Sequence, residues 1–168
     1  MTHIHTVLKN DRSSYTIRSV YKQVKSEYKT FYAMDCYANE IEWLRKLQST
    51  KIVPRLLFTN DQKQAFATEY VGEPICAATV PKDWEAQRDH ILAILQQHNC
   101  RHNDIKPSEI LVQNGRLRLV DFGWASLADQ PNPTNYPDVL GSRWKCPSGY
   151  DDRYSFDRSI QYVIQHTQ

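Results

Sequence analysis

The segment His102–Gly123 reads HNDIKPSEILVQNGRLRLVDFG and decides how the rest of the chain is interpreted. Asp104 lies in a polar stretch before a short apolar run, and Asp121 directly follows a second run of alternating polar and apolar residues. Asn114-Gly115 stands between the two runs and is a strong signal for a two-residue hairpin turn. Such a hairpin places both carboxylates at the same end, where they suit a Mg²⁺ ion and its phosphates.

The composition bounds the possible classes of protein. The chain has 168 residues, of which 40% are hydrophobic and 24% charged, so we expect one domain with a sizeable core. The net charge of +2 gives no argument for binding nucleic acid or a membrane surface. A run of about 18 apolar residues, which a transmembrane helix needs, is also missing.

The cysteines indicate the compartment. They are scattered and show no spacing typical of a metal site, and no signal peptide is evident. We therefore expect reduced thiols in a cytoplasmic protein. The four cysteines are Cys36, Cys76, Cys100 and Cys146.

The segment around the two aspartates closely resembles the catalytic core of the eukaryotic-like protein kinases. That family carries His-Arg-Asp, a Lys two residues later, an Asn three residues after that, and Asp-Phe-Gly behind a hairpin. Here the order is His102-Asn103-Asp104, then Lys106, then Glu109 in place of the Asn, and then an intact Asp121-Phe122-Gly123.

The resemblance implies an α+β, two-lobed, protein-kinase-like fold. We expect a single domain over residues 1–168, with a small β-rich N-lobe and hinge over residues 1–72 and a helical C-lobe over residues 73–168. The chain is short for a two-lobed kinase, so this C-lobe is expected to be truncated. The glycine-rich loop is missing, because no glycine precedes Gly72. Either Lys9 to Ser14 form a shorter lid, or the first strand pair has been trimmed.

Residues 20–24 have the pattern of a strand and place Val20 and Lys22 on one face. In the kinases a strand at this position carries an essential lysine. The resemblance therefore implies that Val20 touches the adenine of ATP and that Lys22 reaches the α- and β-phosphates. A solvent-facing lysine is the alternative for Lys22, with Lys25 and Lys29 as nearby rivals.

Residues 35–48 have apolar side chains at helical spacing, so we expect a helix. It resembles the regulatory helix of the kinase N-lobe, and Glu40 is then the candidate partner of Lys22. A solvated helix glutamate is the alternative. Residues 55–59 and 64–70 read as two strands, and the second resembles a kinase hinge in which Thr68 is the gatekeeper. Glu69 and Val71 would offer backbone groups to the adenine.

The second half of the chain continues the resemblance. We expect a helix over residues 84–100 that leads into the catalytic loop, an activation-segment-like stretch over residues 124–150, and a helix from Asp152 onward. Asp152 would brace the backbone of the catalytic loop. Six apolar residues crowd this last helix, too many for one buried face, so we expect a homodimer or a partner protein to cover it. They are Tyr154, Phe156, Ile160, Tyr162, Val163 and Ile164.

These residues imply a phosphotransferase that uses ATP and Mg²⁺. Asp104 would orient the attacking hydroxyl and accept its proton, Lys106 would neutralise the γ-phosphate, and Asp121 would bind Mg²⁺. Glu109 can also coordinate Mg²⁺, or it can mark a pseudokinase that serves as a binding module. Lys106-Pro107 resembles the Ser/Thr protein kinases, with a small-molecule or saccharide hydroxyl as the alternative acceptor.

Overall fold

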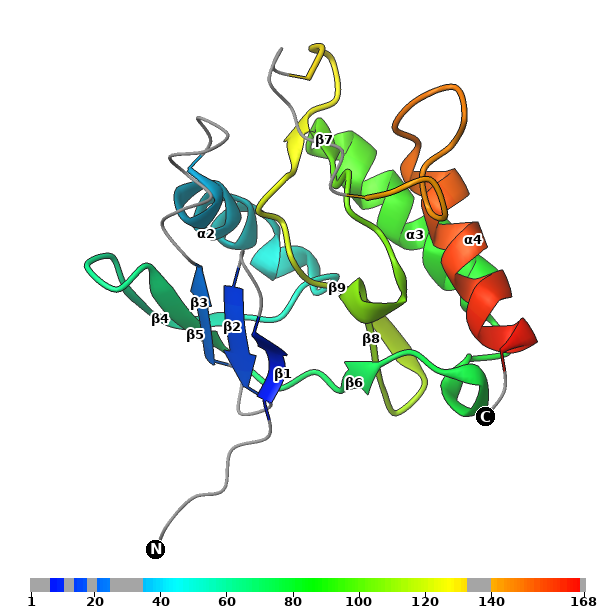
Figure 1. The fold of residues 1–168 in the computed structure, drawn as a ribbon, viewed down its shortest axis with the longest axis horizontal. Helices are drawn as coiled ribbons and strands as arrows, with labels where there is room; N and C mark the ends of the chain where they lie inside the picture. Colours follow the sequence, from blue (N-terminus) through cyan, green and yellow to red (C-terminus); the bar gives the residue numbers. More distant parts are fainter. Residues whose placement is uncertain (1–6, 11–13, 18–20, 25–34, 133–139, 167–168) are drawn as a thin grey trace, which may run out of the picture.

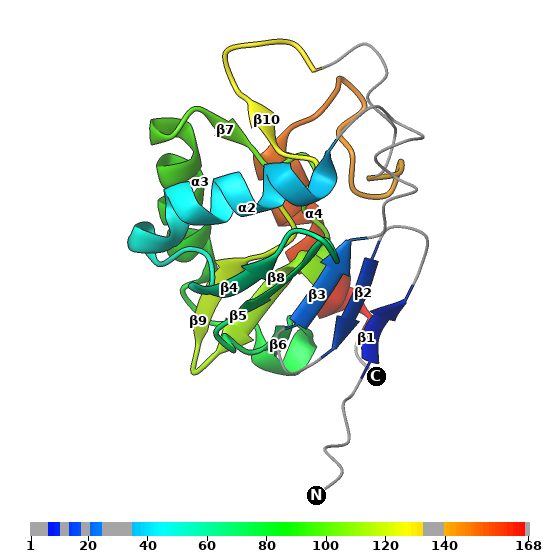
Figure 2. The same cartoon turned by 90° about the vertical axis from the view of Figure 1, so that its left-hand side faces the viewer.

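The computed structural model describes residues 7–10, 14–17, 21–24, 35–132 and 140–166, and the strands before residue 25 by their backbone alone. Figures 1 and 2 show strands of the N-terminal half on one side of the molecule and the helices α3 and α4 on the other. The architecture is the α+β, protein-kinase-like arrangement that the sequence predicts.

The N-terminal strands form one antiparallel sheet in the order β1-β2-β3-β5-β4. Its strands are β1 Val7–Asn10, β2 Ser14–Ile17, β3 Tyr21–Val24, β4 Leu56–Asn60 and β5 Ala65–Thr68. The first strand pair is present, with a register shift between Val7 and Lys9. The alternative in which that pair has been trimmed is therefore wrong.

The first long helix, α2, runs over Cys36–Leu47 and confirms the helix predicted for residues 35–48. It begins where it does because the Asp35 side chain accepts a hydrogen bond from the Ala38 N–H, which caps the first turn. Its apolar stripe is buried, including Ile41, Leu44 and Leu47. Figure 2 shows α2 lying against the sheet, and Glu40 of this helix is buried.

Two short 3-10 helices, η1 Gln48–Thr50 and η2 Ala77–Thr79, precede and follow the segment that contains β4, β5 and Gly72. The backbone of Gly72 passes very close to that of Val112. Its φ is +111°, and an added Cβ would lie 2.0 Å from the Val112 carbonyl oxygen, so this close approach requires glycine. The strand β6, Glu73–Pro74, follows at once and pairs with β8.

The hairpin predicted around Asn114-Gly115 is confirmed. Strands β8 Ile110–Gln113 and β9 Arg116–Leu119 pair in register, and the turn residues have φ values of +52° and +76°. Two left-handed residues are what a type I′ turn needs, and its twist matches that of the strands. The 3-10 helix η3, Pro107–Glu109, leads into β8 from the catalytic loop.

The helix α3 spans Trp84–Gln97 and is shorter than the predicted range of 84–100. Asn99 adopts a left-handed φ of +54°, which ends the helix. Cys100 instead belongs to β7, Cys100–Arg101, which pairs with β10, Ser126–Leu127. The final helix α4, Asp152–Gln165, is capped by Asp151, whose side chain accepts from the Tyr154 N–H.

The helix α4 has one buried face. Phe156, Ile160 and Val163 are buried, and the Tyr162 ring packs edge-on against Trp144 at 5.0 Å. Among the described large apolar residues of α4, Tyr154 (37% exposed) and Ile164 (49%) face solvent. The six apolar residues thus exceed one buried face, as the sequence predicts, and the cover of the two exposed ones by a second copy or a partner stays a prediction. No helix within the described ranges is long and apolar enough to cross a bilayer.

Candidate active site

Three carboxylates meet at the open end of the β8–β9 hairpin. Asp104, Glu109 and Asp121 each bring one oxygen to within 4.8 Å of the others. Asp104 and Glu109 are buried, and Asp121 is half-buried. The sequence predicts that Asp104 and Asp121 share this end of the hairpin, and the structure brings them together with Glu109, the other predicted Mg²⁺ ligand beside Asp121.

His102 holds Asp104 and the strand before Asp121 together. Its Nδ1 accepts a hydrogen bond from the Asp104 N–H at 3.1 Å, and its Nε2 lies 2.8 Å from the Val120 carbonyl oxygen. Because Nδ1 is an acceptor, Nε2 carries the proton and donates it to Val120. The ring also packs edge-on against Phe122 at 4.6 Å.

Asp152 braces the same loop from the other side. Its two carboxylate oxygens accept hydrogen bonds from the backbone N–H groups of His102 (2.8 Å) and Asn103 (3.0 Å). This is the role that the sequence predicts for Asp152. Asn103 has a left-handed φ of +70°, so the loop needs such support to keep its shape.

The backbone around Glu109 sets its side chain beside Asp121. The Glu109 N–H donates to the Lys106 carbonyl oxygen and the Glu109 carbonyl accepts from the Val120 N–H, which joins η3 to the end of β9. Ser108 Oγ donates to Glu109 Oε1 at 3.1 Å. Asp121 itself has a left-handed φ of +66°. Oxygen donors clustered in this way fit the preference of Mg²⁺ for carboxylates.

Lys106 is the basic residue next to the cluster. Its Nζ lies 3.5 Å from Asp104 Oδ1, and its side chain is 27% exposed while that of Asp104 is 4% exposed. The ammonium group therefore offsets part of the negative charge of three neighbouring carboxylates.

The predicted nucleotide residues are only partly described. Glu40 is 2% exposed on α2, and burial of a carboxylate is costly unless it is paired. Lys22 lies in β3 directly opposite Phe66 of β5, and its side chain lies outside the described atoms. Val20 lies outside the described residues. The pairing of Lys22 with Glu40 and the adenine contact of Val20 stay predictions.

The hinge residues follow β5. Thr68 ends that strand and is buried, and Val71 is buried as well. The Glu69 side chain turns toward Arg55, since its Oε1 accepts from the Arg55 N–H at 3.0 Å. The Glu69 N–H also donates to the Arg55 carbonyl oxygen. The adenine contacts of Glu69 and Val71 stay predictions.

Asn39 is a site residue that the sequence gives little reason to select. Its side-chain NH₂ faces three backbone carbonyl oxygens, those of Phe122 (3.3 Å), Gly123 (3.0 Å) and Ala125 (2.8 Å). It therefore ties α2 to the segment that follows Asp121. The only sequence signal is its place next to Glu40 on a helix expected to face the site.

Asn103 is a second site residue that the sequence gives little reason to select. It occupies the place of the family's Arg, is 1% exposed, and donates from Nδ2 to the Trp124 carbonyl oxygen and to Ser126 Oγ. Ser126 in turn donates to Asn132 Oδ1 at 2.7 Å. A chain of uncharged hydrogen bonds thus joins the catalytic loop to β10.

Cys100, one strand before the loop, is not a candidate nucleophile. Burial raises the pKa of its thiol, and the nearby Asp152 carboxylate raises it further. The thiol therefore stays protonated at neutral pH. None of the four cysteines forms a disulfide.

The chain belongs to the protein kinase family, because the family model described as "Protein kinase domain" matches residues 3–147. The resemblance read from His102–Gly123 is therefore confirmed at the level of the family.

The similar curated proteins are themselves named as kinases. Human cyclin-dependent kinase-like 2 is 30% identical over 117 residues, which cover 62% of this chain and 24% of that protein. Human cyclin-dependent kinase-like 4 is 28% identical over 62% of this chain and 30% of its own length. Mouse dual specificity protein kinase TTK is 28% identical over 61% of this chain and 13% of its own. The chain thus spans less than a third of the length of these relatives.

The Asn39 contacts give a testable prediction. We expect Asn39→Asp to lower the free energy of unfolding by about 1–3 kcal/mol, because it removes the donors and sets a carboxylate against three carbonyl oxygens. Chemical denaturation monitored by tryptophan fluorescence measures the change. Glu42→Gln, on an exposed position of the same helix, is the matched control. Equal stability of Asn39→Asp and the parent would contradict this role for Asn39.

Proposed function

We propose that the chain is an ATP- and Mg²⁺-dependent protein kinase that transfers the γ-phosphate to a Ser or Thr hydroxyl. The observation that carries the proposal is the cluster of Asp104, Glu109 and Asp121 with Lys106 beside it. The printed names of the relatives support the same class of reaction.

The side chains divide the work of phosphoryl transfer. Asp104 orients the acceptor hydroxyl and accepts its proton, and its contact with Lys106 at 3.5 Å helps to hold that carboxylate in place. Lys106 neutralises negative charge on the transferred group. Asp121 and Glu109 are the residues that would hold Mg²⁺, which when bound neutralises the phosphates of the nucleotide.

The nucleotide would lie between the sheet and the hairpin. Lys22 would reach its α- and β-phosphates, with Glu40 holding the ammonium group in place. Val20 would contact the adenine ring, and the backbone of Glu69 and Val71 would hydrogen-bond its edge. The burial of Glu40 and of Val71 supports this arrangement.

A pseudokinase that acts as a binding module is the second candidate. The replacement of the family's neutral Asn by Glu109 favours it, because a third carboxylate can hold the metal too tightly for phosphates to share. We propose the active kinase because Asp104, Lys106 and Asp121 are the residue types that the family carries at these positions and lie close together. A reducing compartment such as the cytoplasm is proposed for either candidate, supported by four cysteines that form no disulfide.

The two aspartates should have separable effects. We expect Asp121→Asn to weaken both nucleotide–Mg²⁺ binding and phosphate transfer, because it removes a metal ligand. Asp104→Asn should leave nucleotide binding intact and lower transfer by about 10²–10⁴, the usual contribution of a positioned general base. Calorimetry with ATP and Mg²⁺ and radiolabelled phosphate transfer measure the two effects. If Asp104→Asn transfers phosphate as well as the parent, the proposed mechanism is wrong.

Glu109 distinguishes the two candidate functions. For an active kinase we expect Glu109→Asn to change transfer by less than about tenfold, because either side chain can supply a metal ligand. For a pseudokinase the same substitution should leave an inactive protein or switch activity on. Transfer to a panel of Ser/Thr peptides, sugars and small alcohols is the measurement. Absence of transfer from both forms to every acceptor would support the binding module.

Assembly through the outer face of α4 is a further part of the proposal. Tyr154 and Ile164 are the exposed apolar residues of this helix, and they would lie in the interface with a second copy or a partner. Sedimentation velocity across a hundredfold concentration range should show a dimer for the parent and less of it for the double substitution Tyr154→Lys with Ile164→Lys. A parent that remains a monomer throughout would count against self-association.

A further inference from the structure

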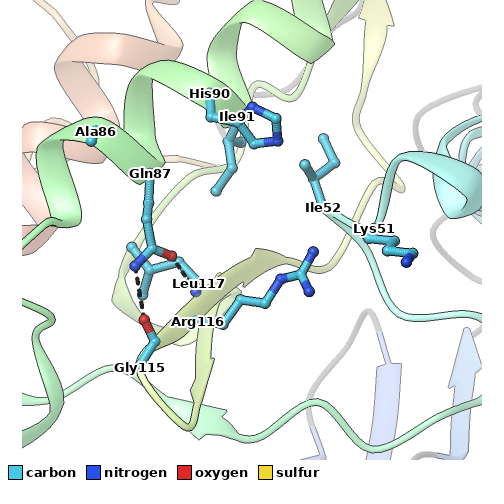
Figure 3. Close-up of a pocket in the computed structure, with 9 residues that line it drawn as sticks. All are labelled: Lys51, Ile52, Ala86, Gln87, His90, Ile91, Gly115, Arg116 and Leu117. Atoms are coloured by element: carbon cyan, nitrogen blue, oxygen red, sulfur yellow. Dashed lines mark hydrogen bonds between the residues drawn. The ribbon is translucent and has the colours of Figure 1, made fainter.

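A cavity of about 350 Å³ lies at the turn end of the β8–β9 hairpin, away from the carboxylate cluster. The strands have four residues each and rise about 3.3 Å per residue, so roughly 13 Å separate the two ends of the hairpin. Figure 3 shows the three walls: helix α3, the hairpin turn, and the segment of Lys51 and Ile52. The site for phosphoryl transfer does not use this cavity.

Hydrogen bonds between the walls hold the cavity open in advance of any ligand. Gln87 joins α3 to the hairpin, since its Nε2 donates to the Gly115 carbonyl oxygen at 2.8 Å and its Oε1 accepts from the Leu117 N–H at 2.8 Å. Arg118 Nε donates to the Lys51 carbonyl oxygen at 3.1 Å, which joins the hairpin to the third wall. A preformed pocket does not lose affinity to the ordering of its walls.

The cavity combines an aliphatic base with a basic rim. Ile52, Ile91 and Leu117 form its base, and Lys51, His90 and Arg116 stand around it. Among its described lining residues none is acidic. Figure 3 shows the Arg116 guanidinium reaching from the hairpin toward Ile52, with the His90 ring on the α3 side and Lys51 at the outer edge.

The basic groups of the rim are available to a ligand. Within the part of the chain that the structure describes, the side chains of Lys51, His90 and Arg116 make no ion pair or hydrogen bond. Burial lowers the pKa of the neighbouring Arg118, the charge of Arg116 lowers it further, and the Glu69 carboxylate opposes this shift. A guanidinium in this position can bind a carboxylate through two parallel hydrogen bonds.

We propose that this cavity binds a small carboxylate with a short aliphatic body. The aliphatic part would rest on Ile52, Ile91 and Leu117, and the carboxylate would meet Arg116, with His90 beside it. The volume stands at the small end of the range for ligand pockets, which suits a compact molecule. A free carboxylate and an acidic side chain beside a leucine on a protein share this chemistry.

The probe is sodium octanoate, titrated into the isotopically labelled full chain and followed by amide chemical shifts. We expect shifts that saturate and that centre on Ile52, Gly115 and Leu117. Acetate carries the carboxylate without a long aliphatic chain, and 1-octanol carries the chain without a carboxylate. Each should therefore bind at least tenfold more weakly than octanoate. An acetylated, amidated Leu-Glu-Leu tripeptide that binds more tightly than octanoate would support the same chemistry and identify a protein segment as its source.

Charge reversal at the rim completes the test. Arg116→Glu should weaken octanoate binding at least tenfold, while Arg116→Lys should keep most of it. Arg45→Glu makes the same change at an exposed position of α2 outside the cavity and should bind like the parent. Octanoate that shifts none of the three amides, binds no better than 1-octanol, or binds Arg116→Glu as well as the parent would overturn the proposal.

Discussion

The repulsion among three carboxylates within 4.8 Å is the constraint on which the rest of the site depends. Like charges at such distances disfavour ionisation of all three unless a cation offsets them. Lys106 supplies one positive charge at 3.5 Å from Asp104, and a divalent metal would supply the rest. The fold therefore holds together groups that would separate if their backbone were free to move.

The three carboxylates are held in place by neutral side chains, by backbone groups and by the carboxylate of Asp152. His102 links Asp104 to Val120, and the two oxygens of Asp152 clamp consecutive N–H groups of the loop. Asn39 and Asn103 then fix the segment after Asp121 from two sides. The family's Arg is absent at position 103, so the contact between the catalytic loop and β10 is made by an amide that needs no charged partner.

Much of this arrangement could be predicted from sequence because it is local. The hairpin follows from Asn114-Gly115, and the spacing along it brings Asp104, Glu109 and Asp121 to one end. The contact of Asp152 with the catalytic loop could be predicted from the family resemblance. The contacts of Asn39 and Asn103 could not, because an amide that bonds to groups far along the chain leaves no local sequence pattern.

Sequence patterns predict less where backbone turns and tertiary contacts decide the outcome. The helix α3 ends at Gln97 because Asn99 turns left-handed, although the apolar pattern continues to Cys100. The apolar pattern of α4 correctly predicts more residues than one buried face holds, but it does not show that Trp144 packs over Tyr162 while Tyr154 and Ile164 stay exposed. The cavity at the hairpin turn joins three segments distant in sequence, and no pattern in any one of them indicates it.

The most direct measurement of the central claim is anomalous diffraction from crystals grown with Mn²⁺ and a non-hydrolysable ATP analogue. Mn²⁺ accepts the same oxygen ligands as Mg²⁺ and can be located without ambiguity. The account predicts a Mn²⁺ peak coordinated by Asp121 and Glu109, beside the phosphates and within reach of Asp104. A nucleotide bound without metal at this cluster, or Glu109 turned away from the ion, would contradict it.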